Sequence, residues 1–124
     1  MIVIRITMNV HPANQKELVQ TLLSMMGPME KEKGCLGYTI FYDIENNNLL
    51  TLFEEWRTRK DLDHYLRSEM FSVLLGTKSL LSEPHEIHIY TIEQTEGAEA
   101  VHAVREKNDL RSISMKRGYH DREL

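Results

Sequence analysis

The sequence predicts an α+β domain in which four strands and two helices follow one another in the order β-α-β-β-α-β. Segments that alternate apolar and polar residues open and close the first 95 residues, and two more such segments form a hairpin between them. Apolar residues at steps of three and four fill the two intervals. A period of two is typical of strands, and steps of three and four are typical of helices. This order predicts the ferredoxin-like arrangement, a four-stranded antiparallel sheet with both helices on one face.

The first strand and the first helix are expected over residues 2–10 and 13–32. Residues 2–10 carry apolar side chains at the even positions, as in a strand with one buried face. One apolar stripe then recurs at helical spacing: Leu18, Leu22, Met25, Met26 and Met29. Gly27-Pro28 interrupts the helical hydrogen bonds and predicts a kink or an early end, and Gly34 is a natural terminator.

The hairpin and the second helix follow. Strands are expected over residues 35–43 and 49–56, joined by the asparagine-rich turn 45–48, because asparagine tolerates positive φ. Residues 58–81 are expected to be helical, and residues 86–92 form the last strand.

Two apolar stripes are predicted along the second helix. The first should cover the chain's own sheet: Leu62, Leu66, Met70, Val73 and Leu80. The second lies nearly opposite and comprises His64, Phe71 and Leu75, at steps of seven and four. A helix with two apolar stripes has two surfaces to contact, so we expect the second stripe to line a cleft or face a neighbour.

Two parts of the chain are left without a partner inside this domain. Because both helices cover one face of the sheet, the other face keeps apolar side chains exposed, and a homodimer packed sheet to sheet is the simplest way to bury them.

Residues 96–124 form a C-terminal extension after the domain of residues 1–95. The extension has few large apolar residues, so we expect it to be partly helical over residues 98–107, or mobile, and to dock on the domain or on the partner subunit if it docks at all.

Composition excludes several classes of protein. The chain has 124 residues, of which 19 are acidic and 15 basic, and its net charge is −4, whereas nucleic-acid binders usually carry a basic excess. No apolar run approaches the ~18 residues that a membrane-spanning helix needs. No signal peptide is recognisable, and the single cysteine, Cys35, has no partner for an internal disulfide. We therefore expect a cytoplasmic protein that binds neither nucleic acid nor membrane.

Three ordered motifs resemble those of a known family. They are Gly34-Cys35-Leu36-Gly37-Tyr38, Phe53-Glu54-Glu55-Trp56 and Leu62-Asp63-His64-Tyr65-Leu66-Arg67-Ser68-Glu69-Met70-Phe71. Together with the opening strand, they make about residues 1–93 similar to the antibiotic biosynthesis monooxygenase domain. The resemblance implies a dimeric α/β barrel in which two sheets pack face to face, with small flat substrates bound between sheet and helices. It also implies chemistry without a cofactor, because some relatives oxidise anthrones or quinols with molecular oxygen and no metal, flavin or haem.

Other relatives degrade haem, and one position argues against that activity here. The haem-degrading relatives need a histidine one helical turn after the helix phenylalanine, to bind the iron. In this chain Leu75 follows Phe71 at that spacing. We therefore expect neither haem nor a metal ion.

His64 is the candidate catalytic residue. It lies on the second stripe, and in the resemblance it falls on the family's helix histidine. An imidazole titrates near neutral pH and can take a proton from a phenol or an enol. The structural alternative is a half-buried histidine that hydrogen-bonds the backbone or a partner chain.

The candidate substrate-binding residues are Trp56, Tyr65, Phe71 and Asn9. The indole of Trp56 offers a flat surface for a planar ligand. The structural alternative, which is the favoured one, is a cap on the sheet core or the dimer interface. Asn9 is a candidate because an asparagine on this strand polarises bound oxygen in the haem-degrading relatives. Glu54 shares a face with Trp56 and needs a partner there, for which Arg5 and a backbone amide are both available.

The sequence thus favours a cofactor-independent monooxygenase acting on a small aromatic or quinol-type metabolite. His64 would remove a proton, and the resulting anion would pass an electron to oxygen in an apolar pocket that excludes water. The alternative is a non-catalytic dimeric module that binds a small hydrophobic molecule or acts in regulation.

Overall fold

The computed structural model describes the backbone of residues 1–114 and the side chains of residues 1–107. The chain divides into two units, Met1–Glu93 and a second unit that begins at Gln94. The second unit contains α5 (Ala98–Ser114), a helix longer than the predicted 98–107. The end of the predicted extension, residues 115–124, lies outside the described residues. Within the described part of the chain, no helix has both the length and the apolar character to cross a bilayer.

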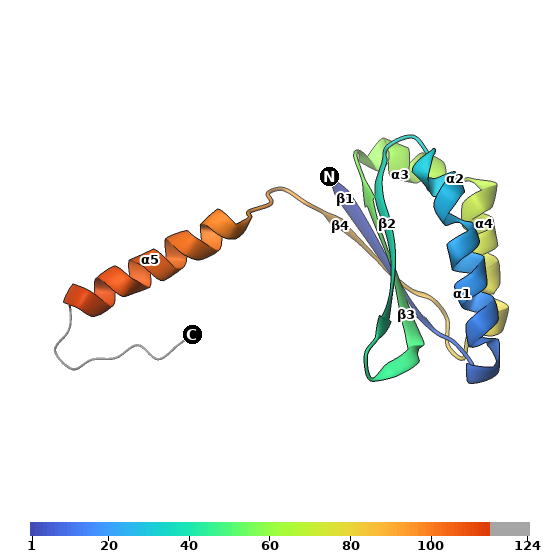
Figure 1. The fold of residues 1–124 in the computed structure, drawn as a ribbon. Helices are drawn as coiled ribbons and strands as arrows, with labels where there is room; N and C mark the ends of the chain where they lie inside the picture. Colours follow the sequence, from blue (N-terminus) through green and yellow to red (C-terminus); the bar gives the residue numbers. More distant parts are fainter. Residues whose placement is uncertain (115–124) are drawn as a thin grey trace. The chain divides into compact units, whose positions relative to one another are not determined.

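The first unit contains the four-stranded antiparallel sheet that the sequence predicts. Its strands are β1 (Ile2–Asn9), β2 (Cys35–Asp43), β3 (Asn46–Trp56) and β4 (Glu86–Thr91), in the spatial order β2-β3-β1-β4. Every neighbouring pair is antiparallel. Figure 1 shows the helices of this unit gathered on one face of the sheet. The predicted ferredoxin-like α+β fold is therefore confirmed, as an open sheet with one uncovered face.

Each of the two predicted helices forms as a series of shorter segments. The first is replaced by the 3-10 turn η1 (Pro12–Asn14), α1 (Gln15–Ser24) and α2 (Met26–Glu30). The second is replaced by α3 (Arg59–Leu66), α4 (Glu69–Gly76) and the 3-10 turn η2 (Thr77–Leu80). Both breaks have an identifiable local cause.

The break in the first helix follows from Pro28. A proline cannot donate a backbone hydrogen bond to the residue four positions earlier, and its ring crowds that carbonyl. That residue is Ser24, where α1 ends. Because α2 resumes within two residues, Met25 and Met29 both remain buried. The predicted kink is present, and it begins just before the Gly27-Pro28 pair.

The break in the second helix contradicts the predicted pair of stripes. Ser68 has an extended backbone, with φ −79° and ψ 162°, and its hydroxyl accepts a hydrogen bond from the Phe71 amide at 3.2 Å. Because α4 starts afresh there, residues on the two sides of the break do not share one helical phase. Val73 is 55% exposed, whereas Phe71 and Leu74 are buried. The core-facing side of α4 is therefore set by Phe71 and Leu74, not by Val73.

The core lies between the sheet and the helices. Strands β1 and β3 bury their even-numbered side chains: Ile2, Ile4, Ile6, Met8, Leu50, Leu52, Glu54 and Trp56. The helices bury a matching set: Leu18, Leu22, Met25, Met29, Leu62, Tyr65, Phe71 and Leu74. The predicted alternation of the first strand is confirmed, and the same alternation in β3 brings the Glu54 carboxylate among apolar side chains.

The uncovered side of the sheet, called the open face below, carries the odd-numbered side chains of β1 and β3 and the residues paired with them. Its members include Val3, Arg5, Thr7, Thr39, Phe41, Thr51, Phe53, Glu55, His88 and Tyr90. Phe41 and Phe53 meet edge to face with 6.4 Å between ring centroids, and His88 stacks on Tyr90. The open face is therefore mixed, with aromatic rings around a central arginine.

Candidate functional site

A carboxylate in the core is the least expected feature of the molecule. Glu54 lies on the helix-facing side of β3 and is 0% exposed. Its cross-strand neighbours on this side are Ile4 of β1 and Tyr38 of β2. A charge in such surroundings is costly unless hydrogen bonds compensate it, so the fold must supply donors to both carboxylate oxygens.

Two side chains donate to the Glu54 carboxylate, one to each oxygen. The Trp56 indole donates from Nε1 to Oε1 at 3.0 Å, and the Tyr65 hydroxyl donates to Oε2 at 3.0 Å. Trp56 reaches Glu54 because residues two apart on a strand share a face. Tyr65 comes from α3, so this contact joins the sheet to the helical layer.

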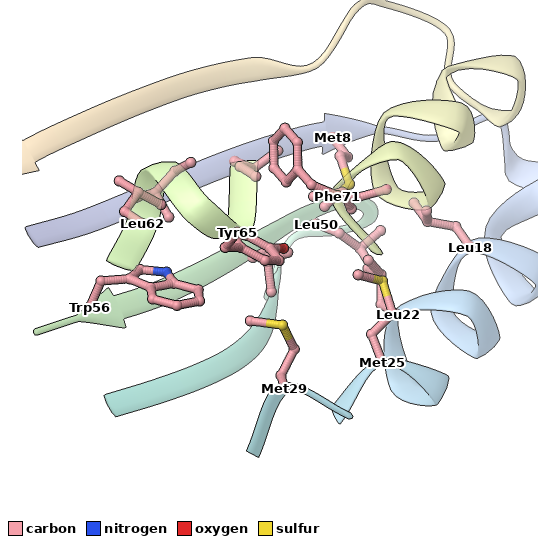
Figure 2. Close-up of a cluster of buried hydrophobic side chains, with 14 of the residues drawn as sticks. Met8, Leu18, Leu22, Met25, Met29, Leu50, Trp56, Leu62, Tyr65 and Phe71 are labelled. Carbon is pink, nitrogen blue, oxygen red and sulfur yellow. The ribbon is translucent and has the colours of Figure 1, made fainter. Parts of the chain in front are cut away.

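The same residues form an aromatic cluster. The rings of Trp56 and Tyr65 stack with 4.8 Å between centroids and 24° between planes, and Phe71 meets Tyr65 edge to face at 5.2 Å. Figure 2 shows these three rings beside one another, between β3 and the helices. Offset-stacked and edge-to-face pairs are the favoured aromatic geometries, so the cluster holds the carboxylate's two donors rigidly.

Two helix starts deliver the aromatic residues to the cluster. The Thr58 hydroxyl accepts from the Asp61 amide at 3.1 Å and caps α3. Within α3, Leu62 and Tyr65 are three residues apart and are both buried, so they share the side that faces the sheet. Ser68 caps α4 in the same way and positions Phe71.

Burial makes the Glu54 carboxyl a group that titrates near neutrality. Desolvation raises its pKa from 4.5 to about 7, against the opposing effect of the hydrogen bonds from Trp56 and Tyr65. Desolvation and the nearby Glu54 charge also raise the pKa of Tyr65 and of Tyr38, so both phenols stay protonated. A carboxyl with a pKa close to working pH can both accept and release a proton.

A pocket of 340 Å³ opens between α2 and β2, on the β2 side of this cluster. Its lining residues are Met26, Glu30, Cys35, Leu36, Gly37 and Tyr38. Tyr38 lies between the pocket and Glu54, because it lines the pocket and is paired directly with Glu54 across β2 and β3. The Tyr38 hydroxyl donates a hydrogen bond to the Leu22 carbonyl at 3.0 Å. The Cys35 thiol has a pKa raised mainly by burial, so it is not an activated nucleophile. The pocket is of a size for a small molecule, and its inner wall is a phenol.

The structure brings together three of the five predicted site residues, Trp56, Tyr65 and Phe71. His64 lies elsewhere: its side chain is exposed on α3 and does not line the pocket. The predicted stripe that joined His64 to Phe71 is absent, because the break at Ser68 separates their helices.

Asn9 lies at the opposite end of the sheet. It pairs with Leu49, whereas Trp56 pairs with Ile2, so roughly 23 Å of strand separates Asn9 from the cluster. Its amide donates instead to the Glu83 carboxylate at 3.1 Å. Among the described residues, no three His, Cys, Asp or Glu side chains are placed to hold a metal ion.

The structure also corrects the partner suggested for Glu54. Arg5 pairs with Phe53 and therefore lies on the open face, on the other side of the sheet. The donors are Trp56 and Tyr65. The sequence had indicated ligand contacts for both residues and, for Trp56, a cap on the sheet core or the dimer interface as the alternative. The spacing of Glu54 and Trp56, two apart on one strand, is the signal that could have revealed the first of these bonds.

Comparison with known proteins agrees with this architecture. Residues 1–74 match the family described as antibiotic biosynthesis monooxygenase. An uncharacterized protein of Synechocystis sp., sll1783, is 30% identical over 96 residues, which cover 77% of this chain and 65% of that protein. The chain thus spans just under two thirds of the length of that relative.

Solved structures show the same fold. A conserved protein from Methanosarcina mazei Go1 is 29% identical, with a TM-score of 0.70 over 74% of this chain and 92% of its own. Rv0793 from Mycobacterium tuberculosis is 22% identical, with a TM-score of 0.71 over 77% of this chain and 98% of its own, and supports the fold alone. The family match covers more than half of the chain, and the chain belongs to the antibiotic biosynthesis monooxygenase family.

Proposed function

We propose that the protein is a cofactor-independent monooxygenase that acts on a small planar phenol, quinol or enol. The observation that carries this proposal is the buried Glu54 carboxyl, whose pKa is raised to about 7 and whose oxygens are held by Trp56 and Tyr65. Family membership supports the reaction class, and the pocket beside Tyr38 supports a small substrate.

The reaction needs a base and a dry, apolar site. For an anthrone-type substrate, Glu54 accepts a proton from the ring CH₂ group, and the carbanion that remains passes one electron to oxygen. The radical pair combines to a carbon-bound peroxide anion, which takes the proton back from Glu54. The resulting hydroperoxide loses water and leaves a carbonyl. One oxygen atom replaces two hydrogens, the other leaves as water, and the substrate supplies all four electrons.

Glu54 replaces His64 as the proposed base for a geometric reason. The carboxyl adjoins the aromatic cluster and the inner wall of the pocket, whereas His64 is exposed and does not line the pocket. Tyr38 would act as a gate, since its hydroxyl must leave the Leu22 carbonyl for a ligand to reach Glu54. The outer pocket, with Met26 and Leu36 as apolar walls, would hold the rest of the ligand.

Aerobic and anaerobic incubation with an anthrone and with menadiol tests this function. We expect oxygen-dependent turnover in the wild type, a roughly 10²–10⁴-fold loss in Glu54→Gln, which cannot accept the proton, and near-normal turnover in His64→Ala. Loss of turnover in His64→Ala with full activity in Glu54→Gln would return the base to His64. Binding that saturates without ligand consumption would favour the second candidate, a small-molecule binding module, for which the pocket is the supporting observation.

The proposal includes a homodimer formed through the open face. Phe41 and Tyr90 expose large aromatic surfaces there, at 51% and 40%. Burying these rings against a second sheet would remove apolar area from water. Light scattering at micromolar concentration should report twice the 14.6 kDa chain mass, and a monomer would contradict this part of the proposal.

A further inference from the structure

Trp56 and Tyr65 share one hydrogen-bond acceptor. The Trp56 indole donates from Nε1 to Oε1 of Glu54 at 3.0 Å, and the Tyr65 hydroxyl donates to Oε2 at 3.0 Å. The two rings also stack, with 4.8 Å between centroids and 24° between planes (Figure 2). Indole and phenol are the aromatic side-chain groups that lose a single electron most readily, and here they contact each other and one shared base.

Burial decides how these two rings can lose an electron. Trp56, Tyr65 and Glu54 are all fully buried, and an isolated charge in such surroundings is costly. A ring that loses an electron but keeps its proton becomes a buried cation, whereas a ring that gives up both stays neutral. The Glu54 carboxyl is hydrogen-bonded to both of the protons concerned, and burial raises its pKa to about 7, so it can accept a proton and release it again.

Tyr38 shows that a buried phenol alone does not provide this route. It is paired with Glu54 across β2 and β3, but its hydroxyl donates to the Leu22 carbonyl at 3.0 Å. A backbone carbonyl accepts a hydrogen bond without taking the proton. Tyr65 differs because its acceptor is a carboxylate, so its proton can leave along a hydrogen bond that already exists.

We propose that Trp56 and Tyr65 form a redox pair that exchanges one electron, with Glu54 carrying the proton between them. This activity goes beyond the proposed monooxygenase reaction, in which neither ring is oxidised. The pair would hold one oxidising equivalent when a peroxyl radical in the pocket takes an electron from the indole. The pocket adjoins the pair, because Cys35 lines it and is paired with Trp56 across β2 and β3.

Each step of the exchange balances in electrons and protons. The peroxyl radical takes one electron from Trp56 and becomes a peroxide anion, which takes a proton from water, while the Nε1 proton passes to Oε1 of Glu54. Tyr65 then gives one electron to the indolyl radical, and its hydroxyl proton passes to Oε2. The proton on Oε1 returns to Nε1. The indole is restored, a neutral phenoxyl radical remains on Tyr65, and Glu54 keeps one proton.

Laser flash photolysis tests the exchange in the wild type. The chain has one tryptophan, so light at the red edge of the indole absorption ejects an electron from Trp56, and the burial of the ring does not prevent this. We expect the indolyl radical to convert to a tyrosyl radical, more slowly in heavy water because protons move with the electron. Electron paramagnetic resonance of protein that carries ring-deuterated tyrosine identifies the final radical. An indolyl radical that persists would show that the rings do not exchange an electron.

Three single variants assign the roles. Tyr65→Phe keeps a ring for the stack but removes the hydroxyl, so the indolyl radical should persist. Glu54→Gln carries an amide that cannot take the proton, so conversion should be roughly a hundredfold slower. Tyr38→Phe is the matched control, because it removes a buried phenol whose acceptor is a carbonyl, and conversion should keep its wild-type rate.

Each variant also has a result that contradicts the proposal. Conversion at the wild-type rate in Tyr65→Phe would assign the radical to another tyrosine, and the same rate in Glu54→Gln would show that the proton leaves by another route. Loss of conversion in Tyr38→Phe would make Tyr38 the partner of Trp56. Circular dichroism shows whether each variant is folded, and the wild-type measurements decide the exchange even where a variant is not. Turnover of anthrone is measured separately, so the monooxygenase reaction and the redox pair can fail independently.

Discussion

Glu54 shows how one residue links stability to chemistry. Its carboxyl is 0% exposed and is held by two charge-assisted donors, Trp56 and Tyr65. A residue with only a structural role at this position would serve as well without an ionisable group, since a buried charge weakens the fold. A carboxyl whose pKa lies near 7 is suited to accept and release a proton at working pH.

The raised pKa of Glu54 predicts a pH dependence of stability. The folded chain binds this proton more tightly than the unfolded chain, so the stabilisation is fully present below about pH 4.5 and is lost as the pH rises to about 7. A pKa raised from 4.5 to about 7 corresponds to about 3 kcal/mol of unfolding free energy.

Glu54→Gln should remove this loss. The variant gives up one of the two hydrogen bonds at every pH, which lowers its unfolding free energy equally at pH 5 and pH 8. Between these two pH values, its unfolding free energy in urea should fall by about 2–3 kcal/mol less than that of the wild type. An equal pH dependence in both proteins would mean that Glu54 titrates normally in the folded chain.

At the scale of elements, caps and breaks position the cluster. Pro28 ends α1, Ser68 separates α3 from α4, and Gly34 leads into β2 with φ at 83°, in the left-handed region that favours glycine. The Ser68 break matters most, because it turns Phe71 into the core beside Tyr65. A continuous helix over residues 58–81 would not bring this pair of rings together in the observed way.

Ser68→Ala should therefore weaken α4. Losing the bond from the Phe71 amide to the Ser68 hydroxyl is expected to lower the unfolding free energy by about 1 kcal/mol. Ser72→Ala is the matched control, because Ser72 is exposed within α4 and its hydroxyl donates only a long 3.4 Å bond to the Ser68 carbonyl. Urea unfolding should show the control within about 0.5 kcal/mol of the wild type. Equal effects of the two changes would argue against the cap.

At the scale of the whole molecule, the two units have different physical characters. Among the residues whose side chains are described, all members of the hydrophobic core lie between Ile2 and Leu81. In α5, by contrast, Val101 and Val104 are both largely exposed, at 57% and 60%. The first unit has the core that an independently folding domain requires.

Removal of residues 94–124 should consequently leave the first unit folded. We expect the truncated chain to keep the thermal midpoint of the full chain within about 2 °C, because none of its core residues is deleted. Scanning calorimetry checks this expectation. If truncation abolishes dimerisation while the thermal midpoint is unchanged, the C-terminal segment carries an intersubunit contact. A large fall in the thermal midpoint would contradict the prediction and show that the core extends beyond Glu93.

Much of this architecture could be predicted from local patterns. The alternation in β1 and β3 and the order of the elements both predicted the sheet correctly, because strand phase depends on residues two apart. The motif residues also identified the family. The helix stripes failed across the Ser68 break, because a helical wheel assumes a continuous phase that one extended residue destroys.

What the sequence by itself determined was the order of elements, the side of each inner strand that is buried, and the family. Only the tertiary structure decided the partners of Glu54, the exposure of His64 and the placement of Arg5 on the open face. These depend on contacts between residues far apart in the chain, such as Tyr65 on a helix meeting Glu54 on a strand. Burial and pKa are properties of such assembled surroundings, so no local pattern contains them.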